Sequence, residues 1–106
     1  MAIDNSLYDS LENTYVKIQG YLYTNQLGPE HSAMIIKHEE LAELLERLDI
    51  EAIEEQSKDI NTLHAELNEI KGVSNRITQE LNGTDATSSV VSGLDEVFSK
   101  ISTLIV

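Results

Sequence analysis

The stretch that decides the fold is residues 60–81, INTLHAELNEIKGVSNRITQEL. Its apolar side chains recur at alternating steps of three and four residues, which places them on one face of an α-helix. It contains no proline and one glycine, Gly72, so nothing within it predicts a helix end. The pattern predicts a helix that buries one stripe of side chains against other helices. The stripe consists of Ile60, Leu63, Leu67, Ile70, Ser74, Ile77 and Leu81.

The residues that follow predict a helical hairpin. Residues 82–85, NGTD, end the first helix, because Gly83 suits a left-handed cap and Thr84 or Asp85 can cap the next helix. A far more apolar helical pattern then covers residues 86–105. A short turn between two helices folds them antiparallel, so their stripes should face each other. The second stripe consists of Val90, Leu94, Val97, Ile101 and Leu104, widened by Phe98.

Upstream, a stripe of the same kind begins after Pro29 and includes Met34, His38, Leu41, Leu45, Leu48 and Ala52. The two successive steps of four residues from Ala52 to Ile60 change the phase of the stripe. Two interpretations follow. Residues 30–81 form one helix of roughly 80 Å that unwinds locally, or the helix breaks near residues 49–59 and Asp49 caps a new one. The absence of an internal proline favours the continuous helix.

At the N-terminus, residues 4–26 carry a third amphipathic pattern, which Asn5 or Ser6 can cap. Leu27-Gly28-Pro29 ends it, because proline disfavours the helical conformation in the residue before it. The chain is therefore predicted to be a single all-α domain over residues 1–106. In this prediction it is an elongated coiled coil, with one long central helix flanked by two shorter antiparallel helices.

Composition excludes several classes of function. The 106 residues include 19 acids against seven Lys and Arg, for a net charge of −12. Such a chain lacks the basic surface that nucleic acids and anionic membranes require. The absence of cysteine excludes disulfides, iron–sulfur clusters and thiolate zinc sites. No segment resembles a signal peptide, and no run approaches the roughly 18 apolar residues of a membrane span. We expect a soluble, cytoplasmic protein.

The histidines invite a metal site, but their spacing does not fit one. A zinc-binding helix of the HExxH type needs a second histidine four residues after His38, where Ala42 stands. A di-iron bundle needs glutamate three residues before histidine, which none of the three has. We expect His31 and His64 on the surface and His38 at a polar position of the stripe. No catalytic residue, metal, cofactor or small-molecule ligand is predicted.

A thin rod would expose a long apolar ridge, which soluble monomers rarely do. We therefore expect the chain to complete its bundle with copies of itself or with other helical subunits. The leading hypothesis is a non-catalytic, acidic interaction subunit: an adaptor, scaffold or small chaperone. The alternative is an acidic regulator that mimics nucleic acid and blocks a DNA- or RNA-binding protein. The predicted partner contacts are Leu41, Leu45, Leu48, Ile60, Leu63, Leu67, Ile70, Ile77, Val90, Leu94, Val97, Phe98 and Ile101.

Overall fold

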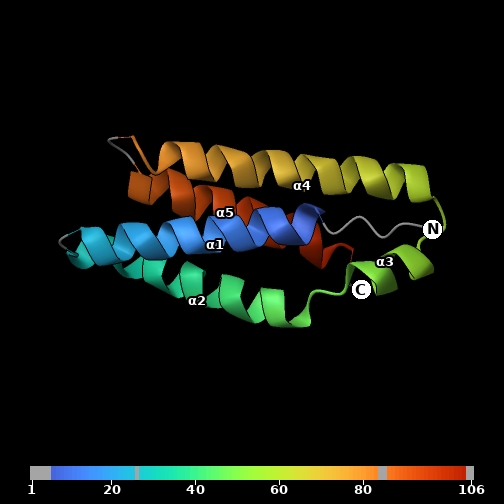
Figure 1. The fold of residues 1–106 in the computed structure, drawn as a ribbon, viewed down its shortest axis with the longest axis horizontal. Coiled ribbons are helices and arrows are strands. Elements are labelled where there is room, and N and C mark those ends of the chain that lie inside the picture. The colour runs from blue at the N-terminus through green and yellow to red at the C-terminus, as the bar shows by residue number, and fades with distance from the viewer. Residues whose placement is uncertain (1–5, 26, 84–85, 105–106) are drawn as a thin grey trace.

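The computed structural model describes residues 6–25, 27–83 and 86–104, and this part of the chain is helical apart from its turns. The predicted all-α class is confirmed. The long helices lie side by side, and a short one lies at the end of the bundle (Figure 1). The elements are α1 (Ser6–Thr24), the 3₁₀ turn η1 (Pro29–His31), α2 (Ser32–Arg47), α3 (Ile50–Gln56), α4 (Ile60–Glu80) and α5 (Ala86–Ser102).

The four long helices form a bundle in which chain direction alternates along the sequence (Figure 1). Helix α1 packs against α2 and α4, and α5 packs against the same two helices. Helices α2 and α4 therefore stand at opposite corners, and α3 carries the chain from one corner to the other. The α1–α2 and α4–α5 hairpins are antiparallel, whereas α1 runs parallel to α4 and α2 runs parallel to α5.

The predicted continuous central helix is wrong. Leu48 and Asp49 are extended, and the carboxylate of Asp49 accepts a hydrogen bond of 3.0 Å from the backbone N–H of Ala52, which caps α3. Asp59 is also extended and caps α4, accepting from the N–H of Thr62 at 3.2 Å and from its hydroxyl at 2.7 Å. Hydrogen bonds from Thr62 lower the pKa of Asp59. The phase change in the sequence marks these breaks.

The breaks also overturn the predicted rod. The molecule measures 46 × 21 × 20 Å, far shorter than the roughly 80 Å of an unbroken helix. Because the chain folds back on itself, the apolar stripes meet inside one chain and the ridge expected to remain exposed is covered. The buried apolar residues are Leu7, Leu11, Ile18, Met34, Leu41, Ile50, Leu63, Leu67, Ile70, Val73, Ile77, Ala86, Val90, Leu94, Val97 and Ile101.

The turn after α4 is tighter than predicted. The N–H of Gly83 donates to the carbonyl of Glu80 at 2.9 Å, and no described glycine has a positive φ. The expected left-handed cap at Gly83 is therefore wrong. The other caps proposed from the sequence, at Asn5, Thr84 and Asp85, lie outside the described residues.

Helix α1 packs against α4 through a buried cluster of hydroxyl groups. The hydroxyl of Thr14 lies 3.2 Å from the carbonyl oxygen of Ser74 and within hydrogen-bonding distance of the Ser74 hydroxyl, and it can donate to either oxygen. The Ser74 hydroxyl also donates to the carbonyl of Ser10 at 3.1 Å. A shift of α1 along α4 would leave these buried groups unpaired, at a cost of about 1–3 kcal/mol each. The cluster therefore fixes the register of the two helices.

Helices α4 and α5 approach each other closely at Gly93, which is buried. A Cβ atom at this position would lie 2.6 Å from Cγ1 of Ile77 and 3.0 Å from its Cδ1. Ile77 is itself completely buried, so a shift of its side chain would disturb the packing around it. Gly93 is thus required by packing.

We predict that Gly93→Ala lowers the free energy of unfolding by about 1 kcal/mol, because overpacking outweighs the gain in helix propensity. The matched control is Gly72→Ala in α4, where a new Cβ meets no described atom within 4 Å. That substitution should raise the free energy of unfolding by up to about 1 kcal/mol. Urea denaturation followed by circular dichroism measures both. Stabilisation of equal size by the two substitutions would contradict the assigned packing.

A second prediction concerns the caps. Asp49→Ala and Asp59→Ala should each lower the free energy of unfolding by about 1 kcal/mol, because each removes the acceptor for a helix N-terminus. Glu66→Ala, at an exposed position inside α4, is the control and should change it by less than about 0.5 kcal/mol. Thermal denaturation distinguishes these outcomes. Indistinguishable melting curves for all three variants would contradict the role of the caps.

Candidate functional site: the cleft between α2 and α5

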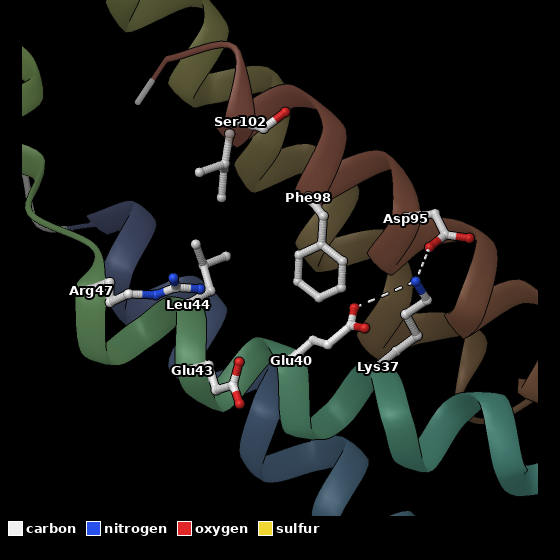
Figure 2. Close-up of a pocket in the computed structure, with 9 residues that line it drawn as sticks. Lys37, Glu40, Glu43, Leu44, Arg47, Asp95, Phe98 and Ser102 are labelled. Carbon is white, nitrogen blue, oxygen red and sulfur yellow. Dashed lines mark hydrogen bonds and ion pairs between the residues drawn. The ribbon is translucent and has the colours of Figure 1, made fainter. Parts of the chain in front are cut away.

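The described residues form a cleft of about 640 Å³ between α2 and α5, two neighbouring helices that are not consecutive in the chain. Figure 2 shows the side chains that line it, reaching from the two helices toward the space between them. We call it the α2–α5 cleft. Helix α2 contributes Lys37, Glu40, Glu43, Leu44 and Arg47, and helix α5 contributes Asp95, Phe98, Ile101 and Ser102.

The floor of the cleft is apolar. Ile101 is buried, whereas Leu44 and Phe98 are only partly buried and pack against the edge of the core. In Figure 2 the ring of Phe98 reaches from α5 toward α2, and Leu44 lies on the opposite wall. Here two apolar side chains on facing walls remain accessible from outside.

One end of the cleft is closed by a charged group that links the two helices. Lys37 Nζ lies 2.7 Å from Oδ1 of Asp95 and 3.5 Å from Oε2 of Glu40 (Figure 2). It also lies 5.7 Å from the centre of the Phe98 ring, within range of a cation–π interaction. The hydrogen bond to Asp95 raises the pKa of Lys37 above its ordinary value. Lys37 therefore stays charged at neutral pH and acts as a clamp, not as a nucleophile.

The other end is open and bears Glu43 and Arg47 at exposed positions of α2. Figure 2 shows the Arg47 side chain extending beside Leu44. The cleft thus combines an apolar floor with a charged rim in which three carboxylates outnumber two basic groups. This arrangement suits the docking of an amphipathic surface better than chemistry on a small substrate, which requires desolvated polar groups.

The structure places most of the predicted partner contacts inside the chain. Phe98 and Ile101 line the α2–α5 cleft, but Lys37, Leu44 and Asp95 were missed by the sequence reasoning. Leu44 directly precedes the stripe residue Leu45, and this widening of the stripe was a usable signal. Nine predicted contacts are buried in the core, namely Leu41, Leu63, Leu67, Ile70, Ile77, Val90, Leu94, Val97 and Ile101; Leu45, Leu48, Ile60 and Phe98 are partly buried.

The predicted surface position of His31 is wrong. Its side chain is buried, and its Nδ1 accepts a hydrogen bond of 2.9 Å from the N–H of Gly28, which closes the turn between α1 and α2. The His38 ring stacks on Tyr15 at 4.1 Å between ring centres, and its Nε2 lies 3.2 Å from the Tyr15 carbonyl. His64 is exposed, as predicted, with Nε2 3.7 Å from Oε2 of Glu54. All three histidines thus have structural neighbours.

No group of three or more potential metal ligands occurs among residues 6–25, 27–83 and 86–104. Within the same residues, none of the helices combines the length and the apolar character that crossing a membrane demands. In comparisons with known proteins, the chain matches no family model, no curated protein and no solved structure. The surfaces of the chain itself are therefore the basis for a functional proposal.

The partly buried His38 predicts a pH dependence of stability. Burial lowers its pKa in the folded state, whereas the unfolded chain has the ordinary value of about 6.5. Both states are neutral above that value, and below it the unfolded state takes up a proton first. The free energy of unfolding should therefore fall as pH drops below about 6.5, until the folded histidine is protonated as well.

We predict that His38→Gln removes the part of the acid-induced fall in the free energy of unfolding that is due to His38. Urea denaturation of both proteins between about pH 7.5 and pH 5 measures it, because the other titrating groups are shared and cancel in the comparison. The advantage in stability of the wild type over His38→Gln should shrink as pH falls. A constant difference across this range would contradict burial of the ring.

Proposed function

We propose that this protein is a non-catalytic interaction subunit that holds an amphipathic helix of a protein partner in the α2–α5 cleft. The observation that carries the proposal is the pair of partly buried apolar side chains, Leu44 and Phe98, that face each other across the cleft between two helices. A helix that places its own apolar face in such a groove would continue the packing of the bundle. Recognition of amphipathic helices by apolar grooves is a recurring mode of peptide binding.

The polar groups of the cleft support a protein partner over a small molecule. Small-molecule sites hold a few polar groups in fixed, desolvated positions. Here the side chain of Glu40 is 47% exposed and that of Asp95 is 56% exposed, so water competes for both. Lys37 is already engaged by these carboxylates. Such groups steer and orient a partner's surface, but they are poorly placed for catalysis.

The charge distribution indicates the chemistry of the partner. Between Glu39 and Glu55 the chain has eight acids and a single basic residue, Arg47. Glu40 and Glu43 line the rim of the cleft, and Glu39 and Glu46 are exposed elsewhere on α2. A partner helix with lysine or arginine beside its apolar face would be attracted to this rim, which raises the rate of association. We therefore propose a basic amphipathic helix.

The fold supports an interaction subunit better than it supports a nucleic-acid mimic. An adaptor, scaffold or small chaperone needs a docking surface, and the α2–α5 cleft supplies a candidate. Assembly with other subunits is no longer needed to complete the core, because the core closes within one chain. A nucleic-acid mimic would gain from carboxylates spread along the elongated rod that the sequence predicted. With the central helix broken at Asp49 and Asp59, that alternative rests on net charge alone.

The proposal predicts where a partner can be captured in the native host. A photo-reactive amino acid in place of Glu43, on the rim, should form a specific adduct, whereas one in place of Glu66, on exposed α4, should not. Mass spectrometry of the adduct should identify an amphipathic helical segment with flanking lysine or arginine. Equal adducts from both positions, or an adduct with a DNA-binding surface of another kind, would overturn the proposal.

Charge reversal supplies the matched control. Excess unlabelled Glu66→Lys protein should compete for the partner as well as the wild type does. Glu43→Lys, which makes the same change of charge at the cleft, should compete at least tenfold less well. Competition of equal strength by the two variants would show that the partner does not bind in the cleft.

A further inference from the structure

A second surface, on the outer side of α1, has the opposite character from the acidic rim. Residues 13–29 contain one charged residue, Lys17, although the whole chain has a net charge of −12. Two large side chains on this surface are exposed to solvent: Val16 is 55% exposed and Tyr23 is 79% exposed. Gly20 lies between them and is also exposed. We call Val16, Gly20 and Tyr23 the α1 outer stripe.

The α1 outer stripe has the spacing of a helix-packing surface. Its members are separated by four and then three residues, the pattern that places side chains on one face of a helix. A different face of α1, which carries Leu7, Leu11 and Ile18, packs into the core of the bundle. At about 100° per residue, Val16 and Tyr23 project to the side opposite that face. Helix α1 is therefore able to pack on both sides.

Gly20 gives a second reason to regard this face as a contact surface. Glycine inside a helix costs about 0.5–1 kcal/mol relative to alanine. Nothing in the described part of the chain lies within 4 Å of a Cβ added there, so packing within the molecule does not require it. Gly72 is equally open, but Lys71 precedes it and no comparable apolar stripe flanks it. At Gly20, the missing side chain would allow another helix to approach closely.

We propose that the α1 outer stripe binds the same stripe of a second copy of this chain, with the two α1 helices antiparallel and crossing at Gly20. Two copies with a charge of −12 repel each other across most of their surfaces. They approach at the lowest electrostatic cost through the part of α1 after Glu12, which carries no carboxylate. A second copy therefore fits this face, whereas the acidic rim of the cleft calls for a basic partner.

Charge also determines the orientation of the pair. In a parallel arrangement, Asp9 and Glu12 would each face the same acid of the second copy, which is unfavourable. An antiparallel arrangement centred on Gly20 moves both acids away from their counterparts. It also places Lys17 opposite Tyr23 of the second copy, where a cation–π contact can form.

The size of the stripe sets the strength of the dimer. The three residues span about two helical turns, so the buried area falls at or below the roughly 1,200 Å² of weak, reversible complexes. Helix α1 is also diagonal to α5 in the bundle, so a dimer through its outer face leaves both α2–α5 clefts open. The dimer would then present two clefts to a repetitive partner. This last consequence rests on the proposed function, whereas dimerisation does not.

Sedimentation velocity over a concentration series reaching about 1 mM tests the proposal. The wild type should show a reversible monomer–dimer equilibrium, and Tyr23→Glu should remain monomeric at every concentration. Asn68→Glu, which adds the same charge at an exposed position of α4, should dimerise like the wild type. A monomeric wild type, or equal association of the two variants, overturns the proposal. Circular dichroism establishes that both variants are folded.

Gly20→Ala separates the contact surface from the stability of the monomer. The substitution should raise the melting temperature in dilute solution, because it improves helix propensity without a clash. It should also weaken the dimer at least tenfold, because the added methyl group keeps the helices apart. An unchanged dimer would overturn the crossing at Gly20.

Because the chain contains no cysteine, single substitutions can report the orientation. In the antiparallel arrangement Val16 lies opposite Thr24 of the second copy. A mixture of Val16→Cys and Thr24→Cys proteins should therefore form the mixed disulfide faster than either protein forms a disulfide with itself. Faster self-linkage of each variant would indicate a parallel pair and overturn the proposal. None of these measurements depends on the cleft, so they stand or fall independently of the proposed function.

Discussion

The whole structure depends on two places where the chain leaves the helical conformation, each closed by an aspartate cap. Asp49 and Asp59 accept hydrogen bonds from backbone N–H groups that would otherwise lack partners at the starts of α3 and α4. These caps let α4 begin at the corner of the bundle opposite α2. Without the breaks, α2, α3 and α4 would form one long helix. The apolar stripes of α2 and α4 could then not face the same core.

Once the chain turns back, different contacts hold the neighbouring helices. Hydroxyl groups at Thr14 and Ser74 fix α1 against α4, and Gly93 allows α5 to approach Ile77 of α4. Between α2 and α5, the long Lys37 side chain also pairs with Asp95 and lies near the face of the Phe98 ring. Long and bulky groups hold helices apart as well as together. The α2–α5 cleft is therefore a consequence of how this corner of the bundle is packed.

The two proposed surfaces differ in charge. The cleft lies beside exposed carboxylates of α2, which suit a basic partner. The outer stripe of α1 has no carboxylate among Val16, Gly20 and Tyr23, which suits a second acidic copy. Because unlike charges attract and like charges repel over about 8–10 Å in physiological salt, each surface disfavours the other's partner. If both proposed surfaces are used, the charge pattern would supply specificity that apolar contact area alone does not.

The sequence by itself determined the helical class, the two hairpins and most core positions, because three-and-four periodicity is a local property that reports which side chains must leave water. Leu67, Ile70, Leu94 and Val97 are buried as that pattern requires. The pattern does not report which surface covers them. The choice between a continuous and a broken central helix involves caps of about 1 kcal/mol each, and it was decided by closure of the whole core. Burial of His31, the contact at Gly93 and the α2–α5 cleft follow from that closure, so only the tertiary structure decided them.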